Sequence, residues 1–342
     1  MEQGAKDPSA GNMWLDRRIS DTLLGALDVN GPLHSLITRR NIEPSLLDVQ
    51  LRRAPKNPSH CWASLYVGLT TVLDVHERAG AIWLDAHPTH KKNGRFDPSW
   101  SVPRPLDAMV RAWPQVEDYL NKAISRLDGH HTDFEGRMHA AMCSGYPSSY
   151  RVINREASPS FESEPVKKHL IERIGQPLWE AMSLASSREP WWPGVRYAKS
   201  PKRFGTSPDV LALDGEGRLL VIEAKPPGAL EGITWGPVQV RFYADMFAEL
   251  FRRQPSASDH IAIMLEQRIA LGLTSPGRVD LAKPLRIVPV LAIGAGRASR
   301  EAIKRATMVQ DAINECAKPT APVSRPEVWV LHTDGEPSLV LG

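Results

Sequence analysis

Three residues in the stretch 207–228 have the types and the spacing that hydrolytic chemistry uses. The stretch reads SPDVLALDGEGRLLVIEAKPPG, and it places Asp209 14 residues before Glu223, with Lys225 two residues further on. Two carboxylates a few ångströms apart repel each other unless a cation lies between them. Oxygen ligands that leave room for water and a substrate phosphate suit Mg²⁺ or Mn²⁺. The three residues therefore predict a site for one of these ions.

The predicted chemistry is hydrolysis of a phosphodiester bond. A bound cation lowers the pKa of a water ligand and neutralises charge on the scissile phosphate. Lys225 would position that water, deprotonate it as the neutral amine, or stabilise the developing charge. The alternative is structural: Glu223 and Lys225 form an exposed ion pair at a strand end, and Asp209 caps a turn. Because the surrounding runs are apolar and carry charges on one face at one end, the chemical interpretation is favoured.

A β-hairpin is the element that would position these side chains. Two apolar runs flank the Asp/Gly-rich turn at 214–217, which predicts strands over 208–213 and 218–225. Side chains alternate along a strand, so Glu223 and Lys225 project to one face, while Ile222 and Ala224 project to the other. When the two strands fold back on each other, Asp209 comes close to Glu223 and Lys225.

Pro208-Asp209 followed by Glu223-Ala224-Lys225 resembles the motif of the PD-(D/E)XK nuclease superfamily, which has a restriction-endonuclease-like fold. On the helix expected over 237–253, Gln239 and Tyr243 are four residues apart and share a face. This QxxxY pattern is similar to that of the RecB-type and lambda-exonuclease-type branch, in which the Gln and Tyr buttress the site or touch the DNA backbone. The resemblance covers about residues 160–333 and implies a nuclease that needs Mg²⁺ or Mn²⁺.

The resemblance also implies an acidic residue on the helix before the Asp strand, as a further metal ligand or its support. Glu162, Glu164 and Glu172 are candidates, and Glu164 is preferred because Ser163-Glu164-Pro165 is typical of a helix start. Glu164 would then join Asp209 and Glu223 at the metal. The alternative is that this glutamate only compensates the helix dipole.

A basic stretch precedes the Asp strand, which predicts contact with nucleic acid. Between residues 190 and 208 the chain has Arg196, Lys199, Lys202 and Arg203 and no acidic residue. Such side chains contact phosphates and position a nucleic acid without reading its sequence. The candidates for phosphate contact are Lys199, Lys202, Arg203 and Arg241, the last from within QVRFY. A solvated loop is the alternative.

The 342 residues suit two domains and an α/β fold class. We expect a disordered lead-in over 1–12, an N-terminal α+β domain over 13–155 that serves recognition or regulation, and a nuclease-like domain over 156–342 with a mixed central sheet flanked by helices. The boundary is placed in the Ser/Pro-rich segment 144–165. Further expected elements are a hairpin in the apolar runs from 63 to 87, a helix over 105–127 that Pro114 kinks or splits, helices over 165–186, 259–270 and 299–316, and strands over 285–293 and 328–333.

Composition narrows the class of protein. The chain has no apolar run of 18 residues and no signal-peptide pattern, so neither a membrane span nor secretion is expected. Three separate cysteines without a CxxC motif suit the cytoplasm, and a zinc site at His139 and Cys143 is disfavoured because a second ligand pair is missing. The net charge of +3 is weak support for a nucleic-acid partner.

These observations predict a metal-dependent nuclease, an endonuclease by preference, that acts on DNA in a restriction, repair or anti-phage defence system; this setting rests on family analogy. RNA is an alternative substrate. A rival function from another class is a nucleic-acid-binding or regulatory protein built on an inactive nuclease fold. The presence of Asp209, Glu223 and Lys225 argues against that rival. The N-terminal domain is expected to contact a partner protein or a second copy of the chain.

Overall fold

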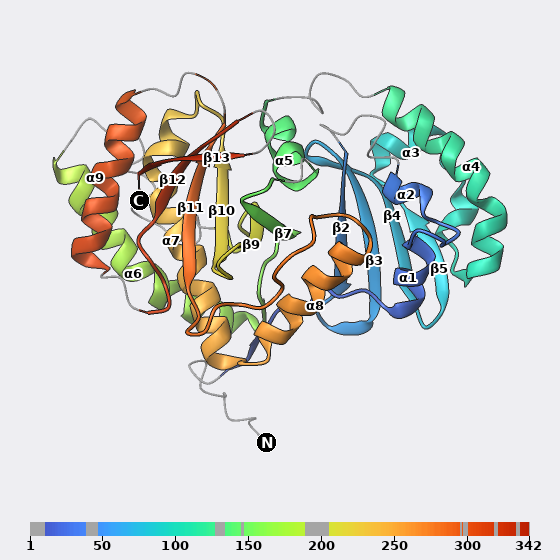
Figure 1. The fold of residues 1–342 in the computed structure, drawn as a ribbon, viewed down its shortest axis with the longest axis horizontal. Helices are drawn as coiled ribbons and strands as arrows, with labels where there is room; N and C mark the ends of the chain where they lie inside the picture. Colours follow the sequence, from blue (N-terminus) through green and yellow to red (C-terminus); the bar gives the residue numbers. More distant parts are fainter. Residues whose placement is uncertain are drawn as a thin grey trace.

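The computed structural model describes residues 11–38, 47–126, 134–144, 147–188, 205–294, 296, 300–317, 321–332 and 336–341. Within these ranges the chain is a mixed α/β structure with two larger sheets side by side (Figure 1). A two-stranded ribbon pairs β1 (Met13–Trp14) with β8 (Ser160–Phe161). The predicted α/β class is therefore confirmed at this level.

A six-stranded mixed sheet carries the predicted hairpin. Its order is β13-β12-β11-β10-β9-β7, in which β10 and β12 run parallel to β11 and the other neighbours are antiparallel. The strands are β7 (Tyr150–Arg155), β9 (Val210–Asp214), β10 (Leu219–Lys225), β11 (Ile287–Ile293), β12 (Glu327–Leu331) and β13 (Pro337–Leu341).

Helices cover both faces of this sheet (Figure 1). Leu219 and Val221 of β10 pack with the helices of one face, whereas Leu220, Ile222 and Ala224 pack with Met138 and Met142 on the other. Every second residue of β10 thus faces the same layer, as predicted. The first face is covered by α6 (Glu164–Arg188), α7 (Leu230–Arg253), α8 (Ala257–Ala270) and α9 (Arg300–Cys316), and the second by α5 (Phe134–Ser144).

The second large sheet is antiparallel throughout, with the order β2-β3-β4-β5-β6. One of its faces packs against helices in a separate apolar cluster that includes Leu23, Val75 and Trp113. Its strands are β2 (Leu47–Ala54), β3 (Asn57–Val67), β4 (Thr70–Arg78), β5 (Ala81–Asp85) and β6 (Arg104–Pro105), and its helices are α1 (Asp21–Leu27), α2 (Ser35–Thr38), α3 (Pro88–Gly94) and α4 (Leu106–Ser125). A short 3-10 helix lies at Pro98–Ser101.

The hydrophobic clusters divide the chain differently from the boundary expected near residue 155. Strand β7 and helix α5 pack in the six-stranded sheet, although both lie inside the segment 13–155. Met13 and Leu15 also belong to the core of that sheet, while Leu271 and Leu273 after α8 belong to the N-terminal core. Because the segment 144–165 is rich in Ser and Pro, the sequence did not indicate the strand β7, whose Tyr150, Val152 and Ile153 are buried.

Several element boundaries differ from the expected ones. Pro114 lies inside α4, which continues as a single helix. Helix α7 begins at Leu230, seven residues before the start expected at residue 237, and Pro237 lies inside the helix. Where a two-stranded hairpin was expected from 63 to 87, the chain forms the three consecutive strands β3, β4 and β5. Of the lead-in, residues 1–10 lie outside the described ranges, and the Asn12 backbone N–H donates to Glu162.

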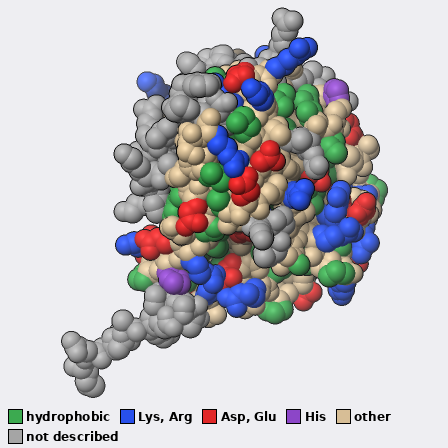
Figure 2. Space-filling view, turned by 90° about the vertical axis from the view of Figure 1, so that its left-hand side faces the viewer, with side chains coloured by type: hydrophobic (Ala, Val, Ile, Leu, Met, Phe, Trp, Pro, Cys, Tyr) green, Lys and Arg blue, Asp and Glu red, His purple; other side chains and the backbone are tan. Residues whose placement is uncertain are grey.

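Charged residues of both signs are interspersed on the face that carries α6 and α9 (Figure 2). Within the part of the chain that the structure describes, no helix is both long and apolar enough to cross a bilayer. This agrees with the absence of long apolar runs in the sequence.

A buried arginine connects the two large sheets. Arg52 of β2 donates from Nη1 to the side chain of Asn154 and the carbonyl of Arg155, both on β7, and from Nη2 to Tyr66 Oη at 3.1 Å. Asn154 returns a bond to the Leu51 carbonyl at 2.9 Å. Removal of the arginine would take this buried donor away from Asn154 Oδ1 and from the Arg155 carbonyl, so the junction depends on it.

We expect Arg52→Ala to lower the free energy of unfolding by about 2–4 kcal/mol, because it leaves buried acceptors on β7 without a donor. Urea unfolding measures the effect, and Arg78→Ala, an exposed arginine on β4, should change stability by less than about 0.5 kcal/mol. Equal stability of the two variants would contradict a bridging role for Arg52.

Candidate active site

The predicted hairpin brings Asp209 and Glu223 to one end of the six-stranded sheet. Ile222 pairs with Val210, so Asp209 precedes β9 beside the last residues of β10. Its Oδ2 accepts a hydrogen bond of 2.7 Å from the Ala224 N–H, which holds the carboxylate against the β10 backbone. The turn that closes the hairpin is held by Asp214, which accepts from the N–H groups of Glu216 and Arg218 at 2.9 Å.

Glu223 is the centre of the contacts. Its Oε1 accepts from Lys225 Nζ at 2.5 Å and from Gln239 Nε2 at 2.7 Å. The same Gln239 nitrogen lies 2.8 Å from Tyr243 Oη, so both QxxxY side chains face the carboxylate. Glu223 is 4% exposed, and its Oε2 is buried without a hydrogen-bond partner within the described ranges. The residues predicted on β10 and α7 therefore form one connected group.

Burial sets the electrostatics of this group. Burial and the Asp209 carboxylate raise the pKa of Glu223 to about 8, against the opposing effect of Lys225. Burial also raises the pKa of Asp209 above its ordinary value. For Lys225, burial lowers the pKa, but the carboxylates of Glu223 and Asp209 outweigh it and the pKa is raised. The site therefore holds an ammonium beside two carboxyl groups that resist being charged together.

Close backbone packing lets two helices reach the end of β10. A Cβ at Gly232 of α7 would lie 3.0 Å from Lys225 Cδ, and a Cβ at Gly294 would overlap the ring of Phe134, the first residue of α5. The Gly294 N–H in turn donates to the Lys225 carbonyl at 2.9 Å. Both helices thus begin at the candidate site.

Glu135, an acidic residue that was not among the sequence candidates, lies at the start of α5. It lies next to Phe134 on α5, and its charge raises the pKa of both Glu223 and Lys225, which places it in the electrostatic field of the site. The sequence signal for helix α5 is weak, because this segment has little amphipathic pattern and follows a polar segment. Only the packing of α5 over β10 brings this carboxylate to the strand end.

His139 lies one turn further along α5, with Nε2 3.7 Å from Asp209 Oδ2. Burial and the neighbouring Arg155 guanidinium lower its pKa to about 3, so the imidazole is neutral. A neutral ring beside Asp209 adds no positive charge to the site. Its role is to fill the space between α5 and β9.

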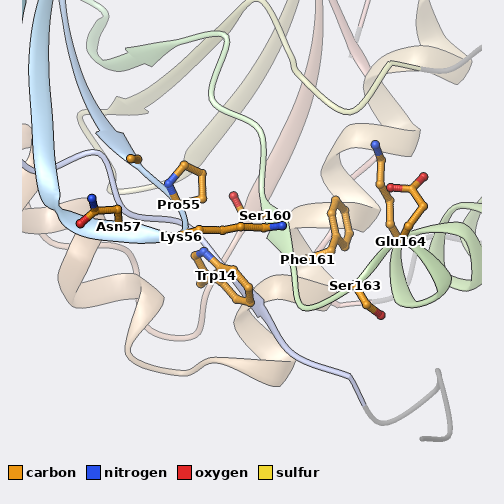
Figure 3. Close-up of a pocket in the computed structure, with 10 residues that line it drawn as sticks. Trp14, Pro55, Lys56, Asn57, Ser160, Phe161, Ser163 and Glu164 are labelled. Carbon is orange, nitrogen blue, oxygen red and sulfur yellow. The ribbon is translucent and has the colours of Figure 1, made fainter. Parts of the chain in front are cut away.

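Glu164 lies away from this group. It lines a pocket of about 550 Å³ with Trp14, Lys56 and Phe161 (Figure 3). Gly11 contacts Val166 near the start of α6, and its carbonyl accepts from Arg253, the last residue of α7. Tyr243 is ten residues earlier on that helix, a rise of about 15 Å, so Glu164 lies toward the end of α7 that is remote from the QxxxY residues. The ligand role expected of Glu164 is therefore corrected: it does not join Asp209 and Glu223.

The structure also corrects the role of Arg241. Its side chain is 3% exposed, pairs with Asp245 at 3.0 Å and donates to the Ala317 carbonyl at 3.3 Å. Two residues after Gln239 on a helix, it points to the opposite side of α7, so it is not a surface phosphate contact. Lys199, Lys202 and Arg203 lie outside the described residues and stay predictions.

The donor set fits Mg²⁺ or Mn²⁺ bound by two carboxylates. Within the described ranges, no three His, Cys, Asp or Glu side chains are grouped closely enough to hold an ion by themselves. Mg²⁺ keeps several waters and uses one or two carboxylates together with substrate phosphate. The buried Glu223 Oε2 lacks a partner and lies in the same group as Asp209. A cation between these carboxylates would satisfy that oxygen and relieve their repulsion.

Comparisons with protein-family models, with curated proteins and with solved structures found no match to this chain.

We expect the protein in EDTA to lose stability as the pH rises from about 4.5 to 8. The folded state holds the Glu223 proton up to a pKa of about 8, whereas the unfolded state releases it near 4.5, so folding is penalised across this window. Relative to Glu223→Gln, the free energy of unfolding should fall by on the order of 2–4 kcal/mol.

Urea unfolding at a series of pH values measures this difference. The exposed Glu164→Gln variant is the control and should follow the parent protein at every pH. Parallel curves for the parent protein and Glu223→Gln would show that Glu223 titrates at an ordinary pH.

Proposed function

We propose that this chain is a metal-dependent nuclease of the PD-(D/E)XK type, with a restriction-endonuclease-like core, which hydrolyses phosphodiester bonds in DNA. The observation that carries the proposal is the group formed by Asp209, Glu223 and Lys225 at the end of the hairpin. A mixed sheet flanked by helices on both faces agrees with such a core. The hydrogen bonds from Gln239 to Glu223 and to Tyr243 agree with the QxxxY branch.

Asp209 and Glu223 are the proposed metal ligands. A bound Mg²⁺ would supply a water of lowered pKa and positive charge at the scissile phosphate. The Ala224 N–H fixes the Asp209 carboxylate, and Gln239 holds one oxygen of Glu223, which leaves Oε2 as the free oxygen for a cation. These bonds preorganise the two carboxylates before substrate arrives.

Lys225 is the proposed catalytic cation. Its pKa is raised by the neighbouring carboxylates, so it remains an ammonium at neutral pH. In that form it stabilises negative charge on the phosphate or orients the attacking water by hydrogen bonding, rather than acting as a base. Its side chain is 19% exposed, so Nζ is reachable from solvent.

Glu135 replaces Glu164 in this proposal as the acidic residue of a preceding helix. Helix α5 precedes β7 and β9 in the chain and packs over β10, and the charge of Glu135 acts on both Glu223 and Lys225. Its role is to support the cation or a water bound to it. A binding protein on an inactive fold would need none of this charge arrangement.

We expect cleavage of DNA with Mg²⁺ or Mn²⁺ and none in excess EDTA, because the ligands are hard carboxylates. Lys225→Ala should lower the cleavage rate by about 10²–10³-fold, since it removes charge stabilisation in the transition state. The readout is the single-turnover rate on plasmid, linear duplex, single-stranded DNA and RNA.

The matched control for this measurement is Lys122→Ala, an exposed lysine on α4, which should cut at the parent rate. Cleavage that survives chelation, or a Lys225→Ala variant as fast as the parent protein, would rule out the proposed chemistry.

Two further variants distinguish the acidic candidates. We expect Glu135→Gln to reduce the rate by about 10-fold or more, because it removes a carboxylate that supports the cation. Glu164→Gln should cut at the parent rate, since Glu164 of α6 lies near the end of α7 that is remote from the candidate site. Rates at several Mg²⁺ concentrations measure the effect, and the reverse order of the two variants would return the role to Glu164.

A further inference from the structure

Four aromatic rings form a contiguous group on the N-terminal sheet. Trp62, His76 and Trp83 are direct cross-strand neighbours on β3, β4 and β5. The centroids of Trp62 and His76 are 5.5 Å apart, and those of His76 and Trp83 are 5.1 Å apart with their planes within 9°. His60 joins the group, with centroid distances of 5.1–5.3 Å to the other three rings. We name these four residues the aromatic row.

The aromatic row lies on the face of the sheet that turns away from the helical core. The alternate residues Cys61, Val75 and Leu84 are buried in the cluster with α1 and α4, whereas His60, Trp62, His76 and Trp83 are each partly exposed. Exposed faces of soluble sheets usually carry polar side chains. A contiguous group of large rings with solvent access therefore indicates a binding surface.

The aromatic row is continuous with the junction beside the candidate active site. Arg52 pairs directly with Trp62 across β2 and β3, and it bonds to Asn154 and Arg155 on β7. The next residue, Glu156, donates its backbone N–H to the Asp209 carbonyl at 3.1 Å. A ligand on the rings is thus connected through Arg52, β7 and the Glu156 backbone to Asp209, which precedes β9.

Polar groups border the rings on both sides. On one side, Asp74 and Asp85 are cross-strand neighbours. They lie two residues along their strands from His76 and Trp83. On the other side, the exposed Arg78 pairs with His60. Carboxylates accept hydrogen bonds from the amino groups of bases, and an arginine on the opposite side of the rings offers a contact for phosphate.

We propose that the aromatic row binds unpaired bases of a nucleic acid strand, which stack on its rings while the strand enters the site at Asp209. This inference rests on the proposed nuclease and specifies its substrate as one with a single-stranded segment. Aromatic rings bind any base by stacking without reading its sequence, which suits a surface of several partly exposed rings. In a duplex, the base faces are already stacked and would not reach these rings.

The test measures binding without cleavage, in EDTA, on an Asp209→Asn background. The probes are a labelled 15-nucleotide oligodeoxycytidine, the same strand paired in a duplex, and the RNA of the same sequence. Replacing Trp62 and Trp83 by Ala should weaken binding of the single strands about 25-fold or more, because each stacked base contributes on the order of a fivefold or larger change in affinity. Binding of the duplex should not depend on these replacements.

The matched control replaces the same two residues by Phe, which keeps ring faces and should retain most of the affinity. If the alanine variant does not fold, tryptophan fluorescence keeps the test decisive: single strands should quench the parent protein, and the Phe variant should lose that quenching while it still binds. Equal affinity of the parent and alanine variants, or Phe variants as weak as the Ala ones, would overturn the proposal, as would a parent protein that binds no single strand.

Failure of this inference is distinguishable from failure of the nuclease. If Mg²⁺-dependent cleavage occurs but binding is independent of the rings, the aromatic row is excluded and the nuclease stands. If binding depends on the rings but no substrate is cut, the binding surface stands and the nuclease is excluded.

Discussion

The burial of Glu223 between β10 and α7 is the constraint on which the candidate site depends. A carboxylate with 4% exposure is costly unless its oxygens have partners. Lys225 and Gln239 satisfy one oxygen, and Tyr243 in turn holds Gln239, so four residues are fixed by one requirement. The second oxygen has no such partner within the described ranges, which makes the group suited to receive a cation. The chemistry proposed for the site follows from this incomplete satisfaction.

The junction between the two sheets likewise depends on buried polar groups that need hydrogen-bond partners. Arg52 and Arg155 are buried polar residues at the contact of the two sheets. Arg52 of β2 donates to β7, Arg155 of β7 donates to the Gly68 carbonyl after β3, and β7 pairs with the strand that follows Asp209. Arg155 lies 4.8 Å from the Tyr66 ring and lowers the pKa of His139 beside Asp209. The N-terminal sheet is therefore packed directly against the support of the candidate site. A ligand bound to its aromatic row would lie beside the elements that position Asp209.

The helix α5 shows how a supporting residue can come from an unexpected part of the chain. The resemblance to known nucleases pointed to a helix directly before the Asp strand, which is α6 in this protein. However, α6 begins near the end of α7, whereas α5 begins beside the end of β10, on the other face of the sheet. Position in space, rather than order along the chain, is the reason that we propose Glu135 over Glu164.

The sequence by itself determined the hairpin, its alternation and the QxxxY face, because each depends on spacing within one element. Strand period fixes Glu223 and Lys225 on one side, and helix period fixes Gln239 and Tyr243 together; the same period shows Arg241 on the opposite side of α7. Only the tertiary structure decided where Glu164 lies, where β7 belongs and that the aromatic rings of β3, β4 and β5 meet in one row. These outcomes depend on contacts between elements far apart in the chain, about which local periodicity carries no information.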